Sequence, residues 1–462
     1  MVSSPRNSSA SQGNTLEPTL ATRLVRPFQR FFEIEAASGI LLLAATLVAL
    51  LWANSPFYGA YYHVLHTPVA LSFGGTSLSL SVHEWISDAL MTIFFFVVGM
   101  EIKRELAYGE LSTRERAMLP VVGALGGMVA PALVYSFFHA GGPAAHGWGI
   151  PMATDIAFAV AALSFFGARV PSGLKVFLLA LAIADDLGAV AVIAVFYTAE
   201  LSLSALGLSG VCLGGTYLMN RIGVRSYSIY WLLGALAWLA MLKSGVHATV
   251  SGVLLGFLTP TRAVVRPGFV LERAREALDN LRELFHMEER EMEQGGHQQR
   301  AKLVQDVRQV SLGTLSPLDN LSRHLEPFVA YFVMPVFALA NAGVRFEAAT
   351  LSDVLAQRVG LAVGLGLVLG KPIGIALFSY AACRFRIAAL PAGVAWNQIW
   401  ATGLLAGIGF TVALFVTNLA FEEAVLIDGA KLGILIGSLV ATLGGACCLA
   451  KVLPRECRDG RP

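Results

Sequence analysis

Four charged side chains lie near the centres of long apolar stretches of this 462-residue sequence: Asp155, Asp185, Asp186 and Lys371. A charge at the centre of a membrane-spanning helix costs at least about 2.5–3.5 kcal/mol on insertion scales, so residues of this kind usually serve a function. Carboxylate oxygens bind hard cations and also protons. The four residues therefore indicate a site that carries a cation and protons across a membrane.

Three of these residues fall at a similar predicted depth. Counting from the charged residues at the inner helix ends, at about 1.5 Å per residue, places Asp155, Asp185 and Lys371 roughly 21, 15 and 20 Å deep. The hydrocarbon core of a bilayer is about 30 Å thick, so all three lie near its midplane. Helices that cross at this depth can bring the three side chains together.

Asp185 and Asp186 are consecutive, so on a helix their side chains diverge by about 100°. They cannot both approach one ion along the same line. One of them can face an aqueous approach while the other meets a partner on a neighbouring helix, and Lys371 is the buried cation available as that partner. We assign Asp186 to the cavity and Asp185 to the lysine.

Two apolar stretches are interrupted. Pro151 and Thr154 break the stretch that contains Asp155, and three glycines loosen another within 403–409. An interrupted helix is tolerated at membrane depth only where it lines a cavity or is buried in protein, and each break leaves the partial charges of two half-helix ends. Asp155 and Lys371 can neutralise those charges, and Thr154 Oγ1 is a possible ion ligand. Pure charge balance by Asp155, without ion binding, is an equally weighted alternative.

The composition identifies these stretches as membrane spans. The chain is 56% hydrophobic and 14% charged, whereas soluble domains are about 25% charged. Runs of roughly 20 apolar residues, the length of one span, recur about twelve times. They lie near 36–54, 88–107, 118–138, 148–167, 173–197, 203–219, 227–241, 246–259, 327–343, 359–382, 397–419 and 430–450. The sequence predicts an all-α polytopic membrane protein with about 12 transmembrane helices.

The distribution of charge predicts the orientation. Of the 33 lysines and arginines, 28 fall in alternate loops on one side, four on the other, and Lys371 lies in the membrane. By the positive-inside rule both termini are cytoplasmic.

The five cysteines suggest no disulfide framework, and no pattern points to a cofactor or to nucleic acid. The predicted segments are a polar cytoplasmic tail (1–30), transmembrane helices (31–260), a charged cytoplasmic insertion (261–326), further transmembrane helices (327–452) and a cytoplasmic tail (453–462).

Two segments depart from the pattern of membrane helices. Residues 69–82 alternate in polarity around Gly74 and Gly75, which predicts an external β-hairpin. A bare hairpin is marginally stable, so we favour pairing with a second copy of the chain over a simple loop. In the insertion, apolar residues from Leu271 to Phe285 step by three and four, which predicts an amphipathic helix. A linker without a specific role explains that helix as well as a regulatory role does.

Buried carboxylates can exchange protons for a cation. Burial raises the pKa of a carboxyl group by as much as about 3–5 units, so a buried aspartate can titrate near neutral pH. Protons then compete with a hard cation such as Na⁺ or Li⁺ for the same oxygens. If two groups each release a proton to admit one Na⁺, one net charge moves per cycle. Asp185 and Lys371 both stay open as the source of the second proton.

Seven segments closely resemble the bacterial Na⁺/H⁺ antiporter A (NhaA) family, and the resemblance runs from about the first span to about Lys451. They are ISDALMTIFFFVVGMEIKREL (86–106), GWGIPMATDIAFAV (147–160), SGLKVFLLALAIADDLGAVAVIAVFYT (172–198), LKSGVHATVSGVLLGF (242–257), FALANAGV (337–344), LGKPIGI (369–375) and GLLAGIGFTVALF (403–415).

The resemblance implies an inverted-repeat fold of twelve helices in which the interrupted fourth and eleventh cross. It implies cation and proton binding at Asp185 and Asp186, with Thr154 and Asp155 at the first break and Lys371 as a charged partner. It further implies electrogenic exchange of two protons for one Na⁺ or Li⁺, activated at alkaline pH. The setting it implies is a bacterial inner membrane, where dimers form through the external hairpin.

The resemblance also links Glu101 and His247 to the response to pH. Here the sequence departs from the family in two places. The segment 261–326 is much longer than in compact members, and LSRHLEPF (321–328) does not match the acidic and histidine positions that precede the ninth span. The pH set-point therefore does not follow from the resemblance.

Other functions fit the sequence less well. An intramembrane aspartyl protease would carry its two carboxylates on separate spans, whereas Asp185 and Asp186 are consecutive. A sodium-coupled symporter of an organic anion would need cationic or aromatic groups for its substrate, and only Lys371 is available. A passive channel would need a selectivity ring, and titratable ligands suit exchange better.

Overall fold

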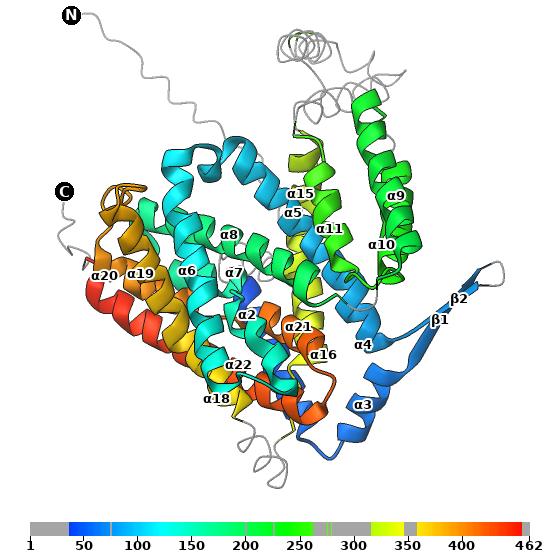
Figure 1. Cartoon of the computed structure of the whole chain (residues 1–462), viewed down its shortest axis with the longest axis horizontal. Helices are drawn as coiled ribbons and strands as arrows, with labels where there is room; N and C mark the ends of the chain where they lie inside the picture. The colour runs from blue at the N-terminus through cyan, green and yellow to red at the C-terminus, as the bar shows by residue number, and fades with distance from the viewer. Residues whose placement is uncertain are drawn as a thin grey trace, which may run out of the picture.

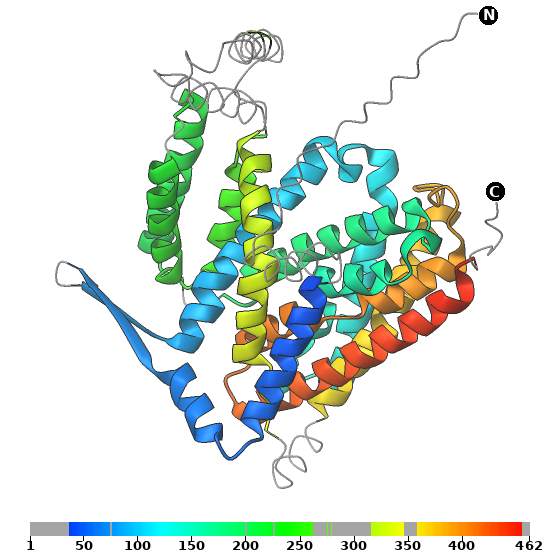
Figure 2. The same ribbon diagram turned by 180° about the vertical axis from the view of Figure 1, so that it is seen from behind.

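The structure is a computed structural model that describes residues 37–73, 76–198, 201–224, 227–261, 275, 279, 316–345 and 358–454. The described part is helical apart from one two-stranded sheet. The helices gather into one body, and the β-hairpin projects away from them at one edge (Figures 1 and 2).

The first part of the chain runs from blue to green in Figure 1. Its elements are α2 (Ala37–Ala53), α3 (Tyr58–His66), β1 (Pro68–Phe73), β2 (Thr76–Ser81), α4 (Val82–Glu84), the π-helical η1 (Trp85–Leu90), α5 (Met91–Tyr108), the 3₁₀ turn η2 (Glu110–Ser112), α6 (Arg114–Phe138), the 3₁₀ segment η3 (Pro143–Met152), α7 (Ile156–Ser164), η4 (Gly167–Arg169), α8 (Ser172–Phe196), α9 (Leu203–Ile222), α10 (Tyr227–Leu242) and α11 (Thr249–Leu258).

The second part runs from yellow-green to red. Its elements are α15 (Pro317–Phe328), the π-helical η6 (Val329–Val333), α16 (Met334–Asn341), α18 (Val359–Leu365), the π-helical η7 (Gly366–Gly370), α19 (Lys371–Arg384), α20 (Trp396–Ala406), α21 (Phe410–Ala420) and α22 (Ala424–Val452).

Each of the predicted spans coincides with a helix or with consecutive helical segments. Six of the described helices are long and apolar enough to cross a membrane, and two bent pairs pass the same test together, α2 with α3 and α20 with α21. The helices α10 and α11 are shorter and also apolar. The prediction of an all-α polytopic membrane fold with a small β-hairpin is confirmed.

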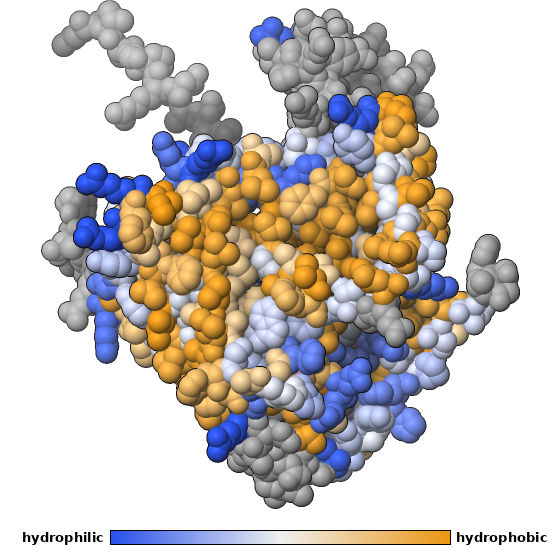
Figure 3. Space-filling model, in the orientation of Figure 1, coloured by the Kyte–Doolittle hydropathy of each residue, from blue (hydrophilic) through white to orange (hydrophobic). Residues whose placement is uncertain are grey.

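The surface of α6 shows how such a helix meets both lipid and protein. Leu125, Val129, Leu133 and Phe137 recur every four residues and are 44–85% exposed, and apolar side chains cover much of the face seen in Figure 3. Another side of α6 approaches α19 so closely that a Cβ added at Gly126 would collide with the backbone of α19. Small residues permit this kind of close helix packing in lipid.

The β-hairpin predicted over residues 69–82 is present. β1 and β2 are antiparallel and pair Val69 with Leu80 and Leu71 with Leu78. The indole N–H of Trp85, in η1, donates to Val69 O at 3.1 Å and so joins the hairpin to the helices. Leu71 is 61% exposed, which leaves apolar surface on a strand pair of marginal stability.

Several predicted segments lie outside the described residues. They include the N-terminal tail 1–30 and, apart from Arg275 and Asp279, the predicted amphipathic helix from Leu271 to Phe285. The predicted division of the chain into segments therefore stays a prediction.

Candidate functional site

The two interrupted spans meet at their breaks. Residues 153–155, between η3 and α7, are extended, and α20 and α21 meet at 49° through residues 407–409. The backbone N–H of Asp155 donates to Ile408 O at 2.6 Å, and Thr154 Oγ1 donates to Ala406 O at 2.9 Å. Each break thus provides hydrogen-bond partners for the other.

Asp155 lies between two helix N-termini. Its Oδ1 accepts from the Phe158 backbone N–H at 3.1 Å in the first turn of α7. Its Oδ2 accepts from Thr411 Oγ1 at 2.6 Å and from the Thr411 backbone N–H at 3.2 Å, in the first turn of α21. Both N-termini carry partial positive charge. One carboxylate, 1% exposed, therefore balances both, which is the geometry that the charge-balance interpretation requires.

Lys371 is buried beside the C-terminal end of η3, on the other side of the break between η3 and α7. Its Nζ lies 2.8 Å from Asp185 Oδ2, and the two side chains are 0% and 1% exposed. The same ammonium donates to Met152 O, at the C-terminal end of η3, where partial negative charge collects. The predicted pairing of Lys371 with Asp185 is present, and the lysine also balances a half-helix end.

Asp186 lies one residue further along α8 and is 2% exposed. It takes part in none of the hydrogen bonds or ion pairs found among the described residues. It interacts electrostatically with the carboxylates of Asp185, Glu101 and Asp155, and with Lys371. Asp185 also keeps one oxygen, Oδ1, without a partner within the described chain. Carboxylate oxygens without a partner therefore occur on both neighbouring aspartates.

This arrangement can hold either a hard cation or protons. Three carboxylates and the Lys371 ammonium are nearly free of solvent contact. If all are ionised, three negative charges are met by one full positive charge and by the partial positive charges at the N-termini of α7 and α21. Burying an uncompensated charge is costly. The excess charge on Asp185 and Asp186 must therefore be met by protons or by a cation on their free oxygens.

A second acidic cluster lies in the C-terminal half of α5. Arg104 NH2 lies 2.5 Å from Glu326 Oε1 of α15, and Glu101 is close enough to interact with both. Sequence reasoning proposed Glu101 but did not assign a role to Glu326, which lies in the segment LSRHLEPF that matched no family pattern. The pairing of Glu326 depends on the approach of α15 to α5, which local sequence does not reveal.

His247 lies between three helical elements. Its Nε2 is 3.4 Å from Asp88 Oδ1 in η1, and its Nδ1 is 2.8 Å from Thr249 Oγ1 at the start of α11. The imidazole and the ring of Phe415 in α21 make a T-shaped contact, with centroids 5.1 Å apart. Among the described residues, the polar neighbours of His247 are Thr249 and an acidic residue, Asp88, that sequence reasoning missed.

A helical membrane protein in which two broken helices cross beside buried carboxylates and a lysine has the architecture of a secondary ion transporter. The sequence matches the family described as Na⁺/H⁺ antiporter 1 over residues 29–449. The chain belongs to this family, in which crossed, broken helices are a known feature. It is a transporter and not an enzyme.

The relatives cover nearly the whole chain. The Na⁺/H⁺ antiporter NhaA of Rhodopirellula baltica is 47% identical over 437 residues, which cover 95% of this chain and 96% of that protein. The antiporter NhaA 2 of Sorangium cellulosum is 47% identical and covers 92% and 89%. The solved structure of the sodium proton antiporter MjNhaP1 from Methanocaldococcus jannaschii aligns with a TM-score of 0.47 at 12% identity, over 92% of this chain and 97% of that one. That last likeness is too weak to support an argument.

The hydrogen bond from Thr411 to Asp155 generates a prediction about stability. Thr411→Val keeps the side-chain volume but removes the hydroxyl donor, which should destabilise the protein by about 1.5–3 kcal/mol because the acceptor is ionised. Thr417→Val is the matched control: it lies on the same helix, is equally buried, and its hydroxyl bonds only to Ala413 O of its own helix.

Thermal unfolding of both variants in detergent measures the difference. We expect a clearly lower midpoint for Thr411→Val than for Thr417→Val. Equal midpoints would mean that Asp155 does not depend on Thr411 to join the two helix ends.

Proposed function

We propose that this protein exchanges cytoplasmic Na⁺ or Li⁺ for external protons, with Asp185 and Asp186 as the shared cation and proton site. The observation that carries the proposal is the buried Lys371–Asp185 pair at the crossing of two broken helices. Beside it lies a second aspartate, Asp186, that has no ion-pair partner among the residues the structure describes. The names of the relatives support sodium and protons as the exchanged ions.

The proposed cycle follows from competition for the same oxygens. Asp186 holds a proton until a cation replaces it, and Asp185 contributes Oδ1, which has no partner among the described residues. Thr154 adds a hydroxyl oxygen at the break, and Asp155 stabilises the crossing. When the cation leaves on the external side of the membrane, the carboxylates take up protons again. A second cation can enter only after the carboxylates release these protons.

Two protons per Na⁺ make the exchange electrogenic in this proposal. One proton belongs to Asp186, and the second to the Lys371–Asp185 pair, either as the ammonium proton or on the carboxyl. One net positive charge then enters per Na⁺ expelled, and the membrane potential contributes about 2.3 kcal/mol per 100 mV. Because Lys371 is already paired with Asp185, it is not free to bind an organic anion, which argues against symport.

We propose that Glu101 and His247 adjust this exchange to pH, each through the neighbour that the structure places beside it. Glu101 lies near the Arg104–Glu326 pair and interacts with Asp186, and His247 faces Asp88. The positive-inside distribution of charge supports a bacterial inner membrane with both termini in the cytoplasm.

We further propose a homodimer formed through the hairpin. β1 and β2 make a sheet of only two strands, and each has an edge that is not paired within the described chain. Such an edge is a template for a strand from another molecule.

Removal of the Asp186 charge tests the site. We expect Asp186→Asn to abolish the collapse of a preformed pH gradient in sealed vesicles on addition of Na⁺ or Li⁺, because an amide cannot exchange a proton for a cation. Asp428→Asn is the control, since Asp428 is a carboxylate of the membrane helix α22 that is only half-buried and interacts with Lys431 of the same helix. Exchange that persists in Asp186→Asn would remove Asp186 from the proposed site.

Removal of the hairpin tests the dimer. Replacing residues 70–79 with a short glycine–serine linker should convert a dimer into a monomer, as measured by light scattering in detergent. Na⁺/H⁺ exchange should persist, because the hairpin contacts the helices far from Lys371. A truncated protein that stays dimeric would show that another surface holds the two copies together.

A further inference from the structure

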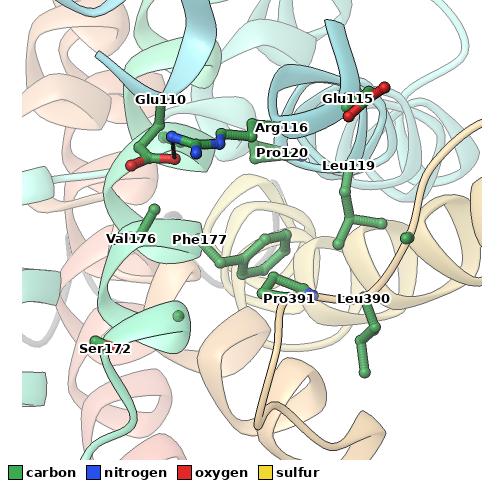
Figure 4. Close-up of a pocket in the computed structure, with 13 residues that line it drawn as sticks. Glu110, Glu115, Arg116, Leu119, Pro120, Ser172, Val176, Phe177, Leu390 and Pro391 are labelled. Atoms are coloured by element: carbon green, nitrogen blue, oxygen red, sulfur yellow. Dashed lines mark ion pairs between the residues drawn. The ribbon is translucent and has the colours of Figure 1, made fainter. Parts of the chain in front are cut away.

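A pocket of about 440 Å³ lies beside residues 110–116 and 389–391, which belong to predicted inner loops; Figure 4 shows the residues that line it. Its rim carries Glu110, Glu115 and Arg116, and Arg116 and Glu110 form an ion pair at 3.7 Å. Its floor is apolar and includes Leu119 of α6 and Phe177 of α8. At about 30 Å³ per water molecule, the pocket has room for on the order of ten waters.

Two helices that line this pocket, α6 and α8, continue toward the buried ion pair, and α19 joins them one turn below the pocket floor. Each of the three contributes residues four positions apart. Side chains four apart on a helix lie on one face. From the pocket inward, the positions are Leu119, Gly123 and Gly127 on α6; Phe177, Leu181 and Asp185 on α8; and Ser379, Ile375 and Lys371 on α19. We call these nine residues the three-helix seam.

The contacts within the three-helix seam are continuous. A Cβ placed on Gly123 would lie 2.9 Å from Ser379 Oγ, 3.0 Å from Leu181 Cδ1 and 3.8 Å from Ile375 Cγ2, so all three helices meet there. One turn deeper, a Cβ on Gly127 would lie 2.9 Å from Ile375 Cγ1 and 3.8 Å from Lys371 Cε. The seam therefore connects the level of the pocket floor with the Lys371–Asp185 pair.

Ser379 is the only hydroxyl residue of the three-helix seam, and its hydroxyl is unusual. It is 0% exposed, and its Oγ has no hydrogen-bond partner among the described residues. A buried serine in a membrane helix commonly bonds to the carbonyl four residues earlier, as Thr417 does here. Buried polar groups without protein partners are typical binding sites for internal water.

The direction of Asp186 separates this seam from the cation site. Consecutive residues on α8 diverge by about 100°, so Asp185 faces α19 and the seam while Asp186 faces another side, where Glu101 of α5 interacts with it. The two aspartates thus face different helices, Asp185 toward α19 and Asp186 toward α5.

We propose that the pocket is the inner mouth of a water route along the three-helix seam, distinct from the approach of the cation to Asp186, and that Ser379 is its hydroxyl relay. Water enters when Leu181 and Ile375 move apart. The Ser379 oxygen then accepts a proton from one hydrogen-bonded neighbour while its own hydroxyl proton passes to the next, so the serine is unchanged. This inference rests on the proposed function, because it supplies a path for the second proton.

Substitution of Ser379 tests the relay in proteoliposomes that contain the full-length protein. Ser379→Ala should lower the turnover of Na⁺/H⁺ exchange at saturating Na⁺ by about tenfold, less than the 10²–10⁴-fold typical of a positioned acid or base, because water can partly replace the hydroxyl. The KM for Na⁺ should stay unchanged, since the cation site is untouched. Ser379→Thr keeps the hydroxyl and should restore turnover.

Two further variants guard against a purely structural effect. Ser209→Ala removes an equally buried serine hydroxyl between α9 and α10, and it should leave turnover unchanged. Gly123→Ala places a methyl group against Ser379 and Leu181, and it should slow turnover without changing the KM. Turnover of Ser379→Ala equal to wild type, or Ser379→Thr as slow as Ser379→Ala, would overturn the relay.

Failure of the water route and failure of the proposed function give different results. If wild type exchanges Na⁺ for protons, Asp186→Asn does not, and Ser379→Ala behaves as wild type, only the water route is wrong. If wild type moves no protons against Na⁺, the proposed function itself is wrong.

Discussion

The ion pair between Lys371 and Asp185 is the interaction on which the rest of the site depends. Two charges 2.8 Å apart and nearly free of solvent contact stabilise a fold weakly at best, because their desolvation offsets their attraction. Loss of one partner, however, leaves an uncompensated buried charge and costs about 3–5 kcal/mol. The pair joins α8 to α19, and Asp186 has no hydrogen-bond or ion-pair partner in the described part of the chain. In the proposed function this leaves Asp186 to bind a proton or a cation.

The crossing of the broken helices makes this pair possible. Lys371 also donates to Met152 O at the end of η3, while Asp155 accepts from the N-termini of α7 and α21. Positive and negative side chains thus balance helix ends of the opposite sign. The breaks need close backbone contact, and glycine provides it, since a Cβ at Gly409 would lie 3.1 Å from Ala153 O. The charges of Lys371 and Asp155 stabilise the broken helix ends, and the partial charges of those ends stabilise the two buried side chains.

Much of this arrangement could be predicted from sequence because charged residues in apolar stretches are conspicuous. The spans, the two interruptions, the hairpin and the pairing of Lys371 with Asp185 follow from hydropathy, helix geometry and charge. Partners that lie far apart in sequence and have ordinary local contexts were missed. Thr411, Glu326 and Asp88 are unremarkable in sequence, and only the packing of α21, α15 and η1 against other helices gives them partners. The free hydroxyl of Ser379 has no sequence signal at all.

The central claim is that protons and a cation compete for the carboxylates beside the Lys371–Asp185 pair. Calorimetric titration of the purified protein with Na⁺, in buffers of different ionisation enthalpy, counts the protons released for each cation bound. Competition predicts a release of between one and two protons per Na⁺ wherever the free site is protonated. Binding of Na⁺ with no proton release at any pH would contradict this account.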